Sequence, residues 1–196
     1  NTMKELVFAT GNPYKVREVN ELLGQEFTVK SLVDIGCHEE LPETNPTIAA
    51  NAVQKAQYVF EHYGVDCFAE DTGLEIDALG GEPGVFSARY AGEDKNDRAN
   101  IQLVLKKLEG QSDRSARFRT VVALVLGGQV HTFEGLAAGS IRTAMSGEGG
   151  FGYDPIFQPA GFGITFAEMP SAEKNKISHR GKAVRQLVAF LKSLNT

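Results

Sequence analysis

The chain has 196 residues, and its 42% hydrophobic and 23% charged residues are ordinary proportions for a soluble globular protein. The net charge of −5 argues against general nucleic-acid binding, which usually needs a basic face, although a local cluster of lysines and arginines could still hold a phosphorylated small molecule. No apolar run approaches the ~18 residues of a membrane span, which argues against a transmembrane protein.

The first elements expected along the chain are a strand, a tight turn and a helix. Residues 5–10 form a short apolar run that predicts a buried strand. Asn12 suits a helix cap and Pro13 the first helical position, and apolar residues then recur at helical spacing. Residues 27–31 predict a second strand, and residues 32–46 a polar loop.

A second helix is expected to be capped at Asn45 and to stop at Gly64. Residues 66–71 and 74–78 then predict two strands, because Thr72 and the glycine after it favour a turn between them.

The second half of the chain mixes one more helix with antiparallel strands. Residues 97–108 predict a third helix. Residues 116–126 and 130–137 predict a long β-hairpin. A glycine-rich loop at residues 146–155 follows, and residues 173–194 predict a terminal helix that is interrupted near residues 179–181. The pattern indicates an α/β fold with a sizeable antiparallel portion.

The segment TGNPYK, from Thr10 to Lys15, carries the first chemical signal. A strand that runs into a helix N-terminus offers free backbone N–H groups and a helix dipole, and both favour an anion. Thr10 and Asn12 add polar side chains, and Lys15 adds a positive charge. The alternative interpretation is a capped helix with a solvated lysine; the segment is not a Walker A loop.

Three acidic residues carry the second signal. Glu43 lies in the polar loop, and Glu70 and Asp71 end an apolar strand where Thr72 is expected to turn the chain. Carboxylates beside a phosphate site usually hold Mg²⁺, and one of them could accept the proton of an attacking water. The alternative is a charged turn on the surface.

Two further segments are rich in aromatic or basic residues. In FGYDP, from Phe151 to Pro155, an aromatic ring could stack on a base and Asp154 could accept from a ring N–H, or these side chains could pack onto the core. In EKNKISHRG, the basic residues could hold phosphate or form a solvated helix face. His179 is a weak candidate metal ligand because no second histidine lies at i+4.

Five segments occur together in the order and spacing of one family: TGNxxK, EDTGL, SARYAG, GGFGYDPIF and EKNxISHRG. On these motifs the chain, from Leu6 to about Leu191, resembles the inosine triphosphate pyrophosphatase family, also called non-canonical purine NTP pyrophosphatases. The resemblance implies an α/β fold with an elongated central mixed sheet flanked by helices. It also implies a single domain over residues 3–196, made of two lobes with a nucleotide cleft between them. The implied reaction is Mg²⁺-dependent hydrolysis of ITP, dITP and XTP to the nucleoside monophosphate and pyrophosphate, by a homodimer.

By the same resemblance, each family site residue has a counterpart here. The triphosphate-binding turn matches Thr10, Gly11, Asn12, Pro13, Tyr14 and Lys15. Further substrate contacts match Lys55, Thr72, Lys174, His179 and Arg180. The base-binding loop matches Phe151, Gly152, Tyr153 and Asp154. The metal site matches Glu43, Glu70 and Asp71, of which Asp71 is also the expected catalytic proton acceptor.

This chain departs from the family pattern at three places. Glu70 precedes Asp71 where the family usually has two aspartates, and Thr72 stands where it often has serine. Both changes keep the charge or the hydroxyl. Ala50 stands where the family commonly has the glutamate of an ENA segment, so no catalytic role beyond that of Lys55 is expected in this stretch.

Three alternative functions stay open. The first is a pyrophosphatase of pyrimidine or modified nucleotides, against which the glycine-rich base loop and the terminal SHR segment argue through resemblance alone. The second is a nucleotide-binding sensor without catalysis, but a pure binder has no need of the acids Glu43, Glu70 and Asp71. The third is an acidic protein–protein interaction module, which only the net charge supports.

The cellular compartment is expected to be the cytoplasm. Cys37 and Cys67 belong to no CxxC motif, which favours two reduced thiols. No basic stretch with a following apolar core opens the sequence, so a signal peptide is not expected. Asn1 and Thr2, before Met3, resemble the remnant of an expression tag and are not expected to belong to the fold.

Overall fold

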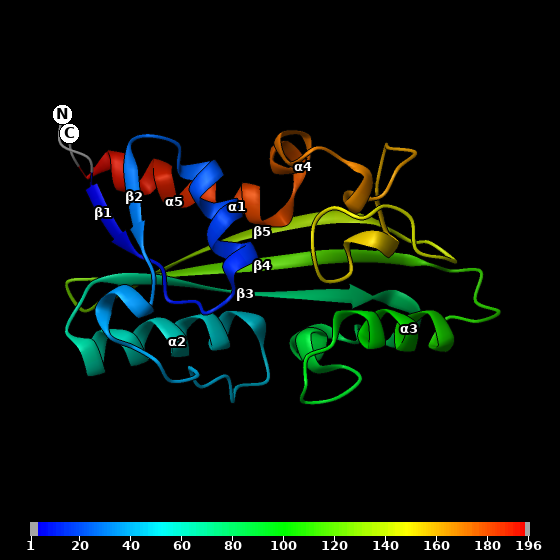
Figure 1. Ribbon diagram of the computed structural model, residues 1–196, viewed down its shortest axis with the longest axis horizontal. Coiled ribbons are helices and arrows are strands. Elements are labelled where there is room, and N and C mark those ends of the chain that lie inside the picture. Colours follow the sequence, from blue (N-terminus) through cyan, green and yellow to red (C-terminus); the bar gives the residue numbers. More distant parts are fainter. Residues whose placement is uncertain (1–3, 195–196) are drawn as a thin grey trace. The chain divides into compact units, whose positions relative to one another are not determined.

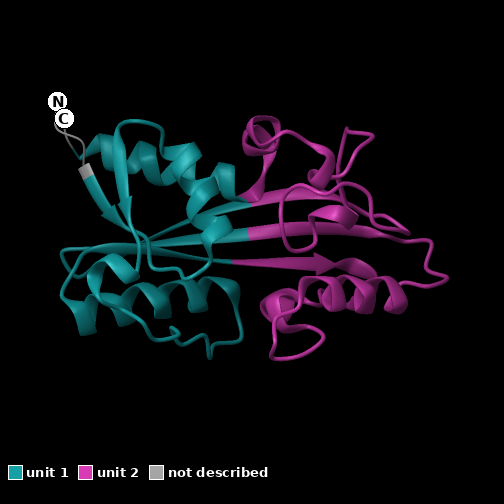
Figure 2. Cartoon of the chain, viewed as in Figure 1, with its two compact units in different colours: residues 1–71, 120–135, 180–196 teal, residues 72–119, 136–179 magenta. Residues whose placement is uncertain are grey.

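A computed structural model describes residues 4–194, which form the helices and strands of Figure 1. The chain divides into two compact units: unit 1 comprises residues 1–71, 120–135 and 180–196, and unit 2 comprises residues 72–119 and 136–179 (Figure 2). The interpretation of Asn1 and Thr2 as a tag remnant lies outside the described residues. Within residues 4–194, every helix is too short or too polar to cross a bilayer.

The strands form one small parallel sheet and one larger sheet. β1 (Lys4–Val7) pairs in parallel with β2 (Phe27–Lys30), from Lys4 opposite Phe27 to Val7 opposite Lys30. The larger sheet has the order β3-β4-β5-β6, with the strands Cys67–Ile76, Ser115–Leu126, Gln129–Ile141 and Phe157–Pro159. β5 and β6 are antiparallel. The predicted mixed α/β architecture is therefore confirmed.

Unit 1 places helices on both sides of its strands. α2 (Ile48–Tyr63) lies on one side, while α1 (Pro13–Leu23) and most of α5 (His179–Ser193) lie on the other (Figure 1). Its core joins α1 and α5 to the strands through Phe8, Val19, Leu23, Phe68, Leu124 and Leu187. A parallel bridge between Phe8 and Phe68 brings the chain that follows β1 beside β3. The turn after β1 and the acids of β3 therefore belong to one unit.

Local sequence signals set the helix ends in unit 1. The Asn12 side chain accepts from the N–H groups of Tyr14 at 2.9 Å and Lys15 at 3.4 Å, which confirms the predicted cap of α1. Gly64 ends α2 with a left-handed φ of 65°, as predicted. The predicted cap of α2 is wrong by two residues, because the Thr47 hydroxyl, rather than Asn45, accepts from the N–H of Ala50.

Unit 2 contains α3 (Asp97–Lys107) and the short α4 (Ser171–Ile177). Asn96 caps α3 by accepting from the N–H of Ala99, and the helix has nearly the predicted bounds. The core of this unit includes Leu74, Ile101, Phe118, Ile156, Phe157 and Phe166. The glycine-rich loop thus connects two strands, β5 and β6, that both contribute residues to this core.

Three sequence expectations need correction. β3 is one continuous strand, so Thr72 lies inside it and makes no turn; pairing in the sheet overrides the local turn preference of Thr and Gly. β5 runs to Ile141, beyond the predicted end at residue 137. The terminal helix is interrupted, as predicted, but the break is at the extended Ser178, just before residues 179–181, which begin α5.

Candidate functional site

The turn after β1 is closed by its own side chains. Thr10 Oγ1 accepts from the N–H of Asn12 at 3.1 Å, and Asn12 Oδ1 is occupied in capping α1. Tyr14 is exposed, whereas Lys15 turns inward and its Nζ lies 3.3 Å from Glu70 Oε1. The turn is thus preorganised, and Lys15 links it to β3.

Lys55 collects three oxygen atoms around one ammonium group. Its Nζ donates to Glu43 Oε1 at 2.5 Å and to the backbone carbonyl of Glu70 at 2.7 Å, and it lies 3.6 Å from Asp71 Oδ1. α2 supplies Lys55, the polar loop supplies Glu43, and β3 supplies the other two. The structure therefore brings these four predicted site residues together.

The electrostatics of this cluster suit acid–base work near neutral pH. Burial raises the pKa of Asp71 to about 6; Lys55 and Lys15 oppose this shift, and Glu43 and Glu70 add to it. Burial alone would lower the pKa of Lys55, but the charges of Asp71, Glu43 and Glu70 outweigh it and raise that pKa. Asp71 is therefore mostly ionised at neutral pH, yet it is basic enough to accept a proton.

Glu70 is bound differently from Asp71, although the two are neighbours. Its Oε1 accepts from Arg180 Nε at 3.0 Å and Nη2 at 2.9 Å, and Arg180 Nη1 donates to Glu18 Oε1 at 2.7 Å. Arg180 and Glu70 are each 1% exposed. Three guanidinium hydrogen bonds thus end on carboxylates, so the geometry favours Arg180 as a residue that orders unit 1. Its assigned contact with substrate stays a prediction.

Glu18 is a member of this cluster that sequence reasoning missed. It is buried on α1, three residues after Lys15 and therefore on nearly the same face of the helix. A carboxylate at that spacing from Lys15, the predicted phosphate-binding lysine, and next to the apolar Val19 was the available signal.

The donor atoms around Lys55 fit a hydrated Mg²⁺ ion. Mg²⁺ prefers oxygen ligands, keeps several waters and commonly takes only one or two carboxylates. The carboxylates of Glu43 and Asp71 face one common positive charge, whereas that of Glu70 is engaged by Arg180 and Lys15. Among residues 4–194, no three His, Cys, Asp or Glu residues are grouped so as to hold a metal unaided. Substrate and water oxygens would have to complete the shell, and the metal assignment stays a prediction.

Unit 2 assembles the predicted base-binding loop. Asp154 Oδ2 accepts from the N–H of Phe151 at 3.1 Å and from Lys174 Nζ at 2.7 Å, and both charged side chains of this pair are buried. Lys174 Nζ also lies 5.0 Å from the centre of the Phe151 ring. The loop, α4 and an aromatic face are thereby joined through one buried ion pair.

Two contacts that the sequence did not reveal fasten the same loop. The Tyr153 hydroxyl donates to the Ser87 carbonyl at 2.6 Å, and the Gly152 N–H donates to Asp97 Oδ2 at 3.0 Å. Burial raises the pKa of Tyr153, so its hydroxyl keeps its proton as a donor. Asp97 is in the first turn of α3 and Ser87 in the segment SARYAG, which explains in part why that segment accompanies the loop motif.

The remaining predicted residues of unit 2 are placed as follows. His179 is buried, and its ring stacks on Phe118 at a centroid distance of 4.5 Å. Its packing suits an apolar wall better than a metal ligand. Thr72 is half-buried within β3. Their contacts with substrate stay predictions.

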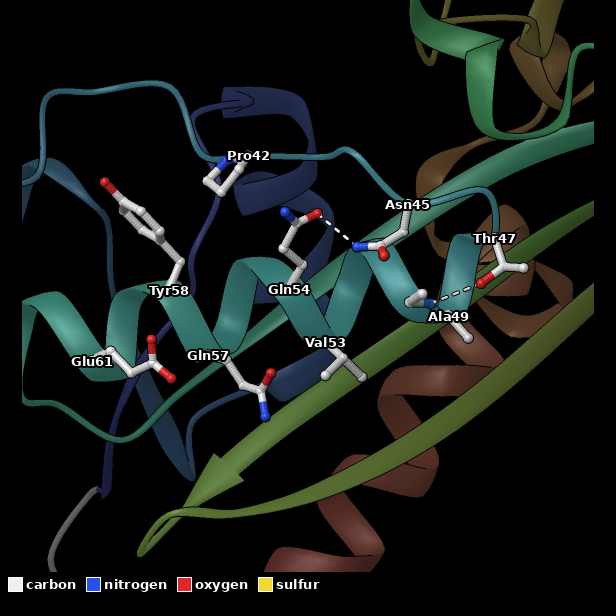
Figure 3. Close-up of a pocket in the computed structure, with 10 residues that line it drawn as sticks. Pro42, Asn45, Thr47, Ala49, Val53, Gln54, Gln57, Tyr58 and Glu61 are labelled. Atoms are coloured by element: carbon white, nitrogen blue, oxygen red, sulfur yellow. Dashed lines mark hydrogen bonds between the residues drawn. The ribbon is translucent and has the colours of Figure 1, made fainter.

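A groove of about 670 Å³ lies on the outer side of α2 in unit 1. Pro42, Asn45, Gln54 and Tyr58 are among its lining residues, which Figure 3 draws as sticks. None of the predicted site residues lines this groove, but Pro42 and Asn45 flank Glu43 in the chain. The groove is therefore lined in part by the loop that carries Glu43.

Comparisons with known proteins agree over nearly the whole chain. The Ham1 family matches residues 6–190. The dITP/XTP pyrophosphatase of Flavobacterium johnsoniae is 54% identical over 187 residues, which cover 95% of this chain and 97% of the relative. That of Bacillus subtilis is 48% identical over 195 residues, which cover 97% and 98%.

Solved structures give the same result. A HAM1 protein from Coxiella burnetii superimposes with a TM-score of 0.88 at 40% identity and covers 97% of this chain and 100% of that one. The Staphylococcus aureus Ham1 protein superimposes with a TM-score of 0.87 at 37% identity, with 97% and 99% coverage.

Proposed function

Because the chain belongs to the Ham1 family, we propose that it hydrolyses non-canonical purine nucleoside triphosphates, ITP, dITP and XTP, to the monophosphate and pyrophosphate. The observation that carries the proposal is the cluster in which Lys55 faces Asp71 and Glu43 beside the Lys15 turn. It combines cations for phosphate oxygens with a buried carboxylate whose pKa is near 6.

In this proposal the residues of the cluster divide proton transfer, phosphate binding and metal binding among them. Asp71 accepts the proton of the attacking water, because its raised pKa lies close to neutral. Lys15 and Lys55 bind phosphate oxygens, and burial already lowers the pKa of Lys15, so an added anion stabilises its charged form. Positioning and electrostatics supply most of the catalysis, and no covalent intermediate is required.

Mg²⁺ is the proposed cofactor, with Glu43 and Asp71 as its holders and Glu70 as the residue that orders Lys15 and Arg180. When bound, it supplies neutralisation of the phosphate charge as the anhydride breaks. The oxygen-rich surroundings of Lys55 support the choice, because Mg²⁺ is a hard cation.

The base is assigned to the loop of unit 2. Asp154 is an acceptor for a ring N–H, Phe151 offers a ring for stacking, and Lys174 is a donor for a keto oxygen. A site built to donate to the keto oxygen of hypoxanthine or xanthine leaves its donor unpaired against the amine of adenine, which is a strong basis for rejection.

A cytoplasmic homodimer without nucleic-acid partners completes the proposal. The family resemblance supports the dimer. The net charge of −5 supports the absence of nucleic-acid binding. The two free cysteines support a cytoplasmic location.

The test is pyrophosphate release from ITP, XTP, GTP, ATP and dUTP at equal concentrations with Mg²⁺, for the wild type and for Asp71→Asn. Strong turnover of ITP and XTP, little of ATP and GTP, and none in Asp71→Asn are expected. Turnover of dUTP instead would move the substrate class to pyrimidines. If no nucleotide is hydrolysed but ITP still raises the melting temperature, the proposed enzymatic function is wrong and a nucleotide-binding sensor is favoured.

A further inference from the structure

The loop residues that follow Glu43 are tied to α2 by side-chain amides. The N–H of Thr44 donates to Gln54 Oε1 at 2.9 Å, and Gln54 Nε2 donates back to Thr44 Oγ1 at 2.9 Å. The Asn45 side chain donates to the same Gln54 oxygen at 2.8 Å, and Figure 3 shows these two side chains pointing toward each other. One glutamine thus binds two consecutive loop residues.

Asn51, one turn earlier in α2, completes the attachment. Its Oδ1 accepts from the N–H of Asn45 at 2.8 Å, and its Nδ2 donates to the carbonyl of Asn45 at 3.1 Å. A single buried amide therefore satisfies both backbone polar groups of Asn45, as a neighbouring strand would. Residues 37–47 form no helix or strand, so side-chain bonds of this kind fix the path of the loop.

The same helix binds the Glu43 carboxylate. Lys55, the residue after Gln54, donates to Glu43 Oε1 at 2.5 Å. Gln54 consequently holds the backbone just after Glu43, while Lys55 holds its side chain. We propose that Gln54 and Asn51 are positioning residues, which fix Glu43 where it faces Lys55 and Asp71.

The inference rests on the proposed function for its catalytic consequence. It also gives a reason for Asn51 in a stretch where the sequence suggested no role beyond that of Lys55. Misplacement of a catalytic group by about 1 Å can cost 10²-fold in rate, so loss of the Gln54 bonds should matter although Gln54 touches no reacting group.

The experiment compares Gln54→Ala with Gln57→Ala, which changes the same residue type three positions on. Gln57 lines the same groove, and within the described chain it makes no hydrogen bond to residues 44–45. Gln54→Ala should lower kcat/KM for ITP by about 10–100-fold. Gln57→Ala should stay within about twofold of the wild type, which is the range of an uninvolved surface change.

A double-mutant cycle separates positioning from general destabilisation. In a Glu43→Gln background, Gln54→Ala should lower kcat/KM little further, because its effect passes through Glu43. An equal loss in both backgrounds, or no loss in Gln54→Ala alone, overturns the inference.

Hydrogen exchange at the amides of Thr44 and Asn45, measured without substrate, tests the attachment independently of activity. Exchange there should quicken in Gln54→Ala and not in Gln57→Ala. Unchanged exchange in Gln54→Ala overturns the inference even if the wild type hydrolyses ITP. An inactive wild type with quickened exchange in Gln54→Ala would instead overturn the proposed function and leave the attachment of the loop standing.

Discussion

Glu70 and Arg180, 110 positions apart in the chain, meet as a buried pair in which one carboxylate oxygen accepts from Nε at 3.0 Å and from Nη2 at 2.9 Å. A buried ion pair adds little to the stability of the fold when compared with well-packed apolar residues. Removing one of its partners, however, is strongly destabilising, because the other charge is left buried. Glu18 on α1 also pairs with Arg180, and Lys15 on α1 also pairs with Glu70. The ion pairs therefore connect α1 with β3 and α5.

Glu70→Gln should destabilise unit 1 strongly. The change leaves Arg180 and Lys15 buried with one negative charge fewer, and breaking a buried pair typically costs about 3–5 kcal/mol. Urea unfolding at pH 7.5 measures the loss. Glu5→Gln is the control, because the Glu5–Lys30 pair is exposed and should contribute less than about 1 kcal/mol. Equal stabilities of the two variants would contradict the prediction.

The free energy of unfolding of metal-free Asp71→Asn should increase relative to that of the metal-free wild type as the pH rises. The pKa of Asp71 is raised from 3.8 to about 6 in the folded protein, so the fold favours the protonated carboxyl. In the wild type this contribution to stability is complete below pH 3.8 and is lost as the pH rises through 6. At 1.36 kcal/mol per pKa unit the shift corresponds to on the order of 3 kcal/mol. Thermal melts in EDTA from pH 4 to pH 8 should show the variant gaining on the wild type and levelling off above pH 7. A constant difference would refute the raised pKa.

Lys55→Met should be destabilising at neutral pH and less so in acid. The methionine keeps most of the stem but leaves Glu43 and Asp71 without their shared cation, a loss of about 3 kcal/mol or more. At pH 5 Asp71 is largely protonated, so the penalty should shrink. Denaturant titrations at pH 5 and pH 7.5 check this. Lys192→Met, which removes an exposed partner of Glu26, should change little at either pH.

Gly150→Ala should disturb the proposed base-binding loop. Gly150 has a φ of 67°, and a Cβ there would overlap the Asp154 carboxylate that binds Lys174. The KM for ITP should rise at least tenfold, and the melting temperature should fall. Gly161→Ala provides the control, since its φ of 85° brings similar backbone strain, about 1–2 kcal/mol, into open space. A normal KM in Gly150→Ala would show that Asp154 does not contact the base.

Short-range patterns in the sequence predicted the parts that neighbours along the chain decide. Asn12 caps α1 and Gly64 ends α2 because a cap depends on one side chain and the next few backbone groups. The strands β4 and β5 followed from apolar runs around a glycine turn. The family motifs then predicted which polar residues form the candidate site, although not how they are arranged.

Only the tertiary structure decided the arrangement of the acids. The sequence placed Glu70 and Asp71 together at a turn, but β3 continues through them, and successive side chains of a strand point to opposite faces. Glu70 therefore meets Arg180, and Asp71 meets Lys55. The partners of Glu18, Asn51 and Gln54 were likewise not predicted, because they lie in other segments of the chain. A local pattern records which residue types are present, whereas the partner of a buried charge or amide is set by chain segments that only the folded protein brings into contact.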